Sequence, residues 1–151
     1  MCENLEKTTL KTFVGFKVVG KHKKTGKYFS VFTGKPYPEN GRIPKWITQK
    51  PLSGHFNSFI LPGSRKKHRE FMKKSINHGG WVSNLIGRTS AFKEYVDADY
   101  LCNKINTHSN TEKDFDFIIV KIKLTDGLMT GTYGDSKVMV GRHMEIIKEM
   151  A

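Results

Sequence analysis

The sequence has few cysteines and few acidic residues, and it has no long apolar run. Its only cysteines, Cys2 and Cys102, cannot build a disulfide framework, which is typical of a protein from the reducing cytoplasm. No stretch approaches the ~20 apolar residues that a membrane span requires. The opening MCENLEKTTLK carries acids where a signal peptide needs an apolar run. The sequence therefore predicts a cytoplasmic protein without a membrane partner.

Motifs that identify a reaction are also missing. The sequence has no GxxxxGK[ST], no GxGxxG and no GxSxG. Its six histidines include no pair with His-x-x-x-His spacing, and no CxxC accompanies them. The acid pairs Asp97 with Asp99 and Asp114 with Asp116 are more typical of a helix surface and a turn than of a metal site. We therefore expect no metal, no cofactor and no catalytic residue, and we interpret the protein as non-enzymatic.

The chain is nevertheless rich enough in apolar residues to fold. It has 151 residues, which suits a single domain, and a globule of this length buries roughly two-thirds of its unfolded surface. The hydrophobic fraction is 37%, with 10 Phe, 5 Tyr and 2 Trp. A disordered chain has fewer apolar residues, so the charges must lie on the surface of a folded domain.

Positive charge is concentrated in the first half of the sequence. The whole chain has 26 Lys and Arg against 14 Asp and Glu, a net charge of +12. Residues 1–75 hold 17 of the basic and 4 of the acidic residues, a net of +13, which leaves 9 and 10, or −1, for residues 76–151. If the two halves are not fully interleaved in the fold, one face carries a positive field, which favours a polyanionic partner.

The N-terminal half is predicted to contain a hairpin and a long loop. Residues 1–11 are treated as a disordered tail. The stretches TFVGFKVV (12–19) and KYFSVFT (27–33) read as two antiparallel strands closed near Thr25-Gly26. Residues 34–54 hold all but one of the five prolines and read as a long irregular loop. FNSFIL (56–61) reads as a third short strand.

The remaining residues are predicted to form two helices and two strands. A helix beginning after Ser64 ends before Gly79-Gly80, and a second helix runs from about Ser90 to Asn106. FDFIIVKIKL (115–124) alternates cleanly at its end, with Lys121 and Lys123 on one face, and KVMVGRHMEII (137–147) alternates as well. The order of these elements predicts an α+β fold: a largely antiparallel sheet of about five strands packed against two helices.

The predicted helix at 64–78 begins with an unusual concentration of cations. The positive end of the helix dipole disfavours cations by about 0.3–1 kcal/mol each when they are exposed, and a bound anion offsets this cost. Free backbone N–H groups near Ser64, surrounded by basic side chains, are able to hold a phosphate. The alternative is a solvated basic helix surface. The predicted phosphate-binding residues of this helix are Ser64, Arg65, Lys66, Arg69 and Lys73.

The tip of the predicted hairpin is a second basic cluster. A lysine-rich tip can lie beside a nucleic-acid backbone, and Tyr28 or Tyr37 is available to stack on a base. A lysine-rich surface turn is also an ordinary aid to solubility. The predicted contacts at this tip are Lys21, Lys23, Lys24 and Lys27.

One stretch of this hairpin resembles a known family. VGFKVVGKHKKTGKYFSVFTG resembles the opening hairpin of the GIY-YIG nucleases, in which two strands joined by a TGK-type turn carry a pair of tyrosines. Tyr28 matches the second tyrosine, whereas Phe16 stands in place of the first and no YIG tripeptide follows. Because a catalytic hydroxyl is missing, the resemblance does not imply nuclease activity for this chain.

These patterns lead to a hypothesis of nucleic-acid or other polyanion binding through the N-terminal half. A first alternative is a protein-interaction module, a small regulator or inhibitor that docks on an acidic partner by electrostatic steering. The basic composition, rich in Lys, Asn and Ile, would suit a phage or other mobile-element product. A second alternative is a small enzyme acting on a nucleotide or phosphorylated substrate, with residues 34–54 as a lid and a site drawn from Arg65, Arg69, His55 and His143.

Overall fold

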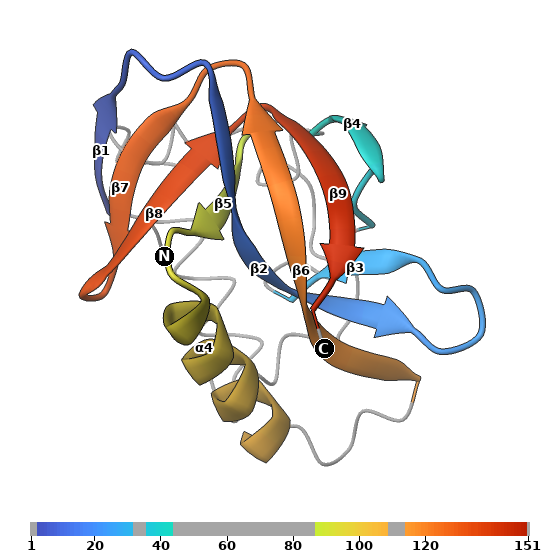
Figure 1. Cartoon of the computed structure of the whole chain (residues 1–151). Helices are drawn as coiled ribbons and strands as arrows, with labels where there is room; N and C mark the ends of the chain where they lie inside the picture. Colours follow the sequence, from blue (N-terminus) through green and yellow to red (C-terminus); the bar gives the residue numbers. More distant parts are fainter. Residues whose placement is uncertain (1–2, 32–35, 44–86, 109–113, 151) are drawn as a thin grey trace, which may run out of the picture.

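The computed structural model describes residues 3–31, 36–43, 87–108 and 114–150. These residues form one nine-stranded sheet in which every paired strand is antiparallel, with the order β1-β7-β8-β5-β2-β6-β9-β4 and with β3 paired to β2 beside this path. The strands are β1 (Glu3–Lys7), β2 (Thr12–His22), β3 (Tyr28–Ser30), β4 (Asn40–Arg42), β5 (Thr89–Phe92), β6 (Phe115–Thr125), β7 (Met129–Tyr133), β8 (Ser136–Gly141) and β9 (His143–Glu149). Helix α4 (Tyr95–His108) lies against β2 and β6, and Figure 1 shows the β2–β3 hairpin projecting from the sheet.

The pairing of β2 with β6 forms the centre of the sheet. The two strands pair without interruption from Thr12 opposite Thr125 to His22 opposite Phe115. Both sequences are dense in β-branched and aromatic residues, which pack well on a pleated surface. Gly15 permits a close approach on β2, because a Cβ there would lie 2.5 Å from the carbonyl oxygen of Phe92 on β5.

Alternate residues of β6 enter two separate apolar clusters, one on each side of the sheet. Phe115, Phe117 and Ile119 belong to the first cluster, which also contains Ala98, Cys102 and Ile105 of α4. The intervening residues of β6 belong to the second cluster, together with Tyr37 and Ile43 from the segment before and after β4. Successive side chains of a strand point to opposite faces, so this central strand contributes side chains to a core on each side of the sheet. The members from β6 in the second cluster are Ile118, Val120, Ile122 and Leu124.

The predicted sheet of about five strands packed against two helices is wrong. The sheet has nine strands, and the described residues contain a single helix. The predicted strands at 12–19, 27–33 and 115–124 correspond to β2, β3 and β6. The predicted strand at 56–61 and the predicted helix at 64–78 lie outside the described residues.

Two of these errors have clear physical causes. The predicted helix from about Ser90 to Asn106 begins instead at Tyr95, and Thr89–Phe92 is strand β5. Phe92 has helical spacing with Tyr95, which suggested one continuous helix, but in the structure it pairs with Phe16 of β2. The predicted strand at 137–147 is two strands, β8 and β9, separated at Arg142, because apolar alternation continues across the corner. Part of the segment 1–11, treated as a tail in the sequence, forms β1 and pairs with β7.

Candidate nucleic-acid interface

The tip of the β2–β3 hairpin is a turn whose backbone groups are hydrogen-bonded. The backbone N–H of His22 donates to the carbonyl of Lys27 (2.9 Å), and that of Gly26 donates to the carbonyl of His22 (2.8 Å). Gly26 has a φ of 70°, in the left-handed region that favours glycine. The imidazole Nδ1 of His22 accepts hydrogen bonds from the backbone N–H groups of Lys24 and Thr25, both at 3.2 Å. The hairpin tip therefore has a defined shape.

The imidazole ring of His22 also anchors this turn to the rest of the fold. It lies edge-on to the ring of Phe115, with 5.0 Å between the centroids, and Phe115 packs in turn against Phe29 of β3. The backbone N–H of Lys23 donates to the carbonyl of Asp114 (2.9 Å). The turn is thus held by β6 as well as by its own hydrogen bonds.

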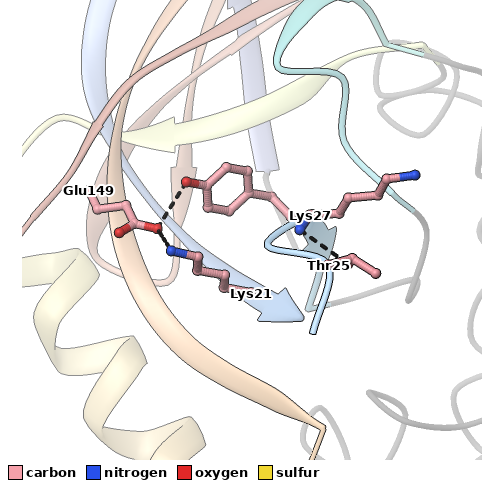
Figure 2. A network of polar contacts seen from close by, with 5 residues as sticks. Lys21, Thr25, Lys27 and Glu149 are labelled. Atoms are coloured by element: carbon pink, nitrogen blue, oxygen red, sulfur yellow. Dashed lines mark hydrogen bonds and ion pairs between the residues drawn. The ribbon is translucent and has the colours of Figure 1, made fainter. Parts of the chain in front are cut away.

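Lys21 and Tyr28 of the hairpin converge on one carboxylate of the last strand. The Lys21 ammonium lies 2.6 Å from Oε1 of Glu149, and the Tyr28 hydroxyl donates to the same oxygen at 2.9 Å (Figure 2). The hydrogen bonds from Lys21 and Tyr28 lower the pKa of Glu149. Burial and the bond to Glu149 raise the pKa of Tyr28, and the bond to Glu149 raises the pKa of Lys21. The predicted phosphate ligand Lys21 is therefore already paired with an anion.

The four hairpin lysines differ in how much of their charge is neutralised. The Lys23 ammonium lies 3.8 Å from the carboxylate of Asp116, a loose and exposed pair. Lys24 and Lys27 are exposed and form no ion pair with the described residues. In Figure 2 the side chain of Lys27 extends away from Glu149, although its backbone N–H donates to the hydroxyl of Thr25 at 3.3 Å. Among these four residues, Lys24 and Lys27 are the cations best placed to meet an external anion.

The two tyrosines predicted to stack on bases are placed differently. Tyr37 is only 8% exposed, and the ammonium of Lys17 lies 5.1 Å from its ring centroid. Lys17 is itself buried and donates to the carbonyl of Ser90 at 2.7 Å. Tyr28 is partly exposed, with its hydroxyl committed to Glu149. A base would therefore reach the ring of Tyr28 more easily than that of Tyr37.

The predicted phosphate site at the start of the basic helix lies outside the described residues, as does His55. The phosphate site and the contribution of His55 to a site of an enzyme therefore remain predictions. His143 begins β9 and pairs with Thr125 of β6 and with Arg42 of β4. The residues of the helix site that remain predictions are Ser64, Arg65, Lys66, Arg69 and Lys73.

The charge asymmetry along the sequence does not become a simple asymmetry in space. β2 from the first half lies between β5 and β6 from the second half, so the two halves of the chain are interleaved in the sheet. The acids beside the hairpin, Asp116 and Glu149, both come from the second half. The net charge of the first half therefore overstates the positive charge at the hairpin tip, where these acids partly neutralise the lysines.

Two arginines form a second cationic cluster that the sequence analysis did not single out. Arg88 donates through Nε to the carbonyl of Gly127 (2.9 Å), and the side chain of Arg142 lies within 3.0–3.2 Å of where a Cβ on Gly127 would stand. Burial and then the charge of Arg142 lower the pKa of Arg88. Gly127 has a φ of 61°, and Asp126 before it has a φ of 60°. These arginines are 54 residues apart in sequence, so no local pattern indicates that they meet.

The geometry of the described residues offers neither a metal centre nor a membrane span. The described ranges contain no group of three or more His, Cys, Asp or Glu residues placed to hold a metal ion. Nor does this part of the chain include a helix with the length and apolar character that crossing a bilayer requires. Comparisons of the chain with protein-family models, with curated proteins and with solved structures give no match.

Proposed function

We propose that the protein binds nucleic acid and that the tip of the β2–β3 hairpin supplies phosphate contacts. The observation that supports this proposal is the pair of exposed lysines, Lys24 and Lys27, on a turn held by His22. Neither forms an ion pair within the described residues, and the chain carries a net charge of +12. Contacts to phosphates release condensed counterions, which drives association without reading the base sequence.

The paired lysines have a different role in this proposal. The ion pair of Lys21 with Glu149 and the backbone hydrogen bond of Lys23 to the carbonyl of Asp114 both help to fix the hairpin on the sheet. A tip that is ordered before binding loses less conformational entropy when it meets its ligand. A two-stranded ribbon is also narrow enough to approach the backbone or enter the major groove of a duplex, which is ≈ 12 Å wide.

The test compares two double charge reversals of equal size. In one variant Lys24 and Lys27 become glutamates, and in the control Lys93 and Lys137, both exposed, become glutamates. Fluorescence anisotropy with a labelled 20-nucleotide DNA, as single strand and as duplex, measures the affinity. We expect Lys24→Glu/Lys27→Glu to weaken binding about tenfold more than the control, because it removes contacts rather than only net charge.

Equal losses in the two variants would assign binding to net charge and overturn the role of the hairpin. A wild-type protein that binds neither DNA, RNA nor heparin at low salt overturns the proposal itself. In that case capture of a single acidic protein would favour a protein-interaction module instead.

A further inference from the structure

The side of the sheet that packs on α4 is only partly covered by this helix. Along β6 the residues on this side change from buried Phe117 and Ile119 to half-buried Lys121, Lys123 and Thr125. The uncovered part extends across four neighbouring strands, and none of its positions is buried. We call it the basic face; it consists of Thr12, Val14 and Phe16 of β2, Lys121, Lys123 and Thr125 of β6, His143, Glu145 and Lys148 of β9, and Asn40 and Arg42 of β4.

The cross-strand pairs on the basic face leave most of its positive charge uncompensated. Lys121 pairs directly with Lys148, and like charges opposite each other destabilise a sheet. Lys123 pairs with Glu145, which is the only acidic residue of the basic face. Arg42 stands opposite His143. Lys121, Lys148 and Arg42 form no ion pair within the described residues, so an anion on this face would relieve their mutual repulsion.

Aromatic rings border the basic face on the side of α4. Phe16 lies opposite Lys121, and its ring packs edge-on against the ring of Tyr95, the first residue of the helix, with 5.5 Å between centroids. Tyr95 is 37% exposed, and Val14, next to Phe16 on the same side of β2, is 45% exposed. A ligand that spans this border meets ammonium groups and an accessible aromatic ring together.

The width of the basic face favours one form of nucleic acid. Neighbouring strands lie ≈ 4.7–4.9 Å apart, so the four strands β4, β9, β6 and β2 span about 14 Å before their side chains are counted. This width exceeds the ≈ 12 Å of the major groove, so the face does not insert into that groove as a two-stranded ribbon does. A single strand can lie across it, with phosphates at the lysines and a base against a ring.

We propose that the basic face binds single-stranded nucleic acid, with Lys121, Lys148 and Arg42 at the phosphates and Tyr95 against a base. This inference rests on the proposed function, and it assigns the nucleic-acid form and a second surface. The hairpin lysine Lys21 points to the other side of the sheet, where Glu149 pairs with Val120 of the second apolar cluster. The effects of substitutions at the hairpin tip and on the basic face can therefore be measured separately.

The test uses the full-length protein and a labelled 20-nucleotide oligothymidine at several salt concentrations, with a 20-base-pair duplex for comparison. Arg42→Glu/Lys148→Glu changes two exposed positions, and Lys93→Glu/Lys137→Glu is the control with the same change in charge. We expect the first variant to reduce the magnitude of the slope of log affinity against log salt concentration by about 1.4, because two phosphate contacts are lost and each contributes about 0.7 with a single strand. The control should keep the wild-type slope.

Tyr95→Leu tests the aromatic contribution separately. Leucine keeps an apolar contact with Phe16 but has no aromatic face, so we expect oligothymidine affinity to fall about fivefold with no change in the salt slope. The Lys24→Glu/Lys27→Glu variant, which lacks the hairpin contacts, should bind the oligothymidine about fivefold or more tightly than the duplex. Circular dichroism checks that each variant is folded. If Arg42→Glu/Lys148→Glu is not folded, Arg42→Gln/Lys148→Gln is used in its place.

The outcomes distinguish this inference from the proposed function. If the wild-type protein binds and the Lys24→Glu/Lys27→Glu variant is weakened, but Arg42→Glu/Lys148→Glu behaves like the control, the basic face is not a binding surface while the hairpin proposal stands. Tighter binding of the Lys24→Glu/Lys27→Glu variant to the duplex than to the oligothymidine also overturns the assignment of a single strand. If the wild-type protein binds no nucleic acid, both proposals fail.

Discussion

Lys21 on β2 and Glu149 on β9 are joined by an ion pair with 2.6 Å between Nζ and Oε1, although β6 lies between their strands. Tyr28 of β3 donates to the same carboxylate oxygen. One acid near the end of the chain therefore holds both strands of the hairpin to the body of the sheet. The same contact neutralises a lysine that the sequence alone presents as a free cation.

This carboxylate predicts a loss of stability in acid. Hydrogen bonds from Lys21 and Tyr28 lower the pKa of Glu149 below its ordinary value of 4.5 in the folded protein. The unfolded state then binds more protons, so the contribution of Glu149 is present above about pH 4.5 and is lost as the pH falls through the lowered pKa. Urea unfolding of wild type and Glu149→Gln at pH 7 and pH 3 measures this contribution. The difference in stability between the two proteins should shrink at pH 3, and a constant difference would contradict the assignment.

Replacement of His22 should loosen the hairpin tip. His22→Ala removes the acceptor for the N–H groups of Lys24 and Thr25 and the ring contact with Phe115, so we expect a loss of about 1 kcal/mol and faster amide exchange at these two residues. His22→Asn is the matched control, because an asparagine side chain can accept a hydrogen bond from the same turn. Unchanged amide exchange in His22→Ala would show that the imidazole does not order the tip.

A methyl group at Gly15 should destabilise the sheet. Its Cβ would lie 2.5 Å from the Phe92 carbonyl oxygen and 2.5 Å from a ring carbon of Phe13, so we expect Gly15→Ala to cost about 1–3 kcal/mol. Val14→Ala is the control on the same strand; Val14 is 45% exposed, and a change there should cost much less. Chemical denaturation of both variants tests this, and equal stabilities would mean that β5 does not approach β2 so closely.

The thiol of Cys102 should react slowly in the folded protein. It is 7% exposed on α4 and donates to the carbonyl of Phe117 at 3.4 Å. Burial, together with the charge of Asp99, raises the pKa of this thiol, so little of the reactive thiolate is present at neutral pH. In a Cys2→Ser variant, an aromatic disulfide reagent should modify Cys102 much faster in urea than in buffer. Rapid modification in buffer would place this thiol outside the core.

The sequence was sufficient to predict the long strands β2 and β6 and the hairpin strand β3, but not the other short strands. β6 alternates in its second half, and both β6 and β2 carry a long run of apolar residues, so both are visible in local patterns. β4 and β5 have three and four residues, too few for a periodic signal, whereas the short strand β3 was predicted because the turn near Thr25-Gly26 joins it to β2. Their strand conformation depends on hydrogen bonds to β2, β9 and β8, partners that lie far away in the sequence or beyond a turn.

The candidate sites show the same limit. The lysines of the hairpin tip form a cluster in sequence, so the tip could be predicted, whereas its neutralising acids Asp116 and Glu149 could not. Lys121 and Lys123 are visible as one face of a strand, but their neighbours Lys148 and Arg42 are brought beside them only by the sheet. Pairing between distant strands is therefore what a single sequence does not reveal.

The measurement that tests nucleic-acid binding most directly is the salt dependence of wild-type affinity for a DNA duplex. Each phosphate contact with duplex DNA contributes about −0.9 to the slope of log affinity against log salt concentration. If Lys24 and Lys27 both contact phosphates, the slope is therefore about −1.8 or steeper. Lys24→Glu/Lys27→Glu should reduce its magnitude by about the same amount, while Lys93→Glu/Lys137→Glu leaves it unchanged. A slope near zero, or one that these hairpin substitutions do not alter, would contradict the proposed role of the hairpin.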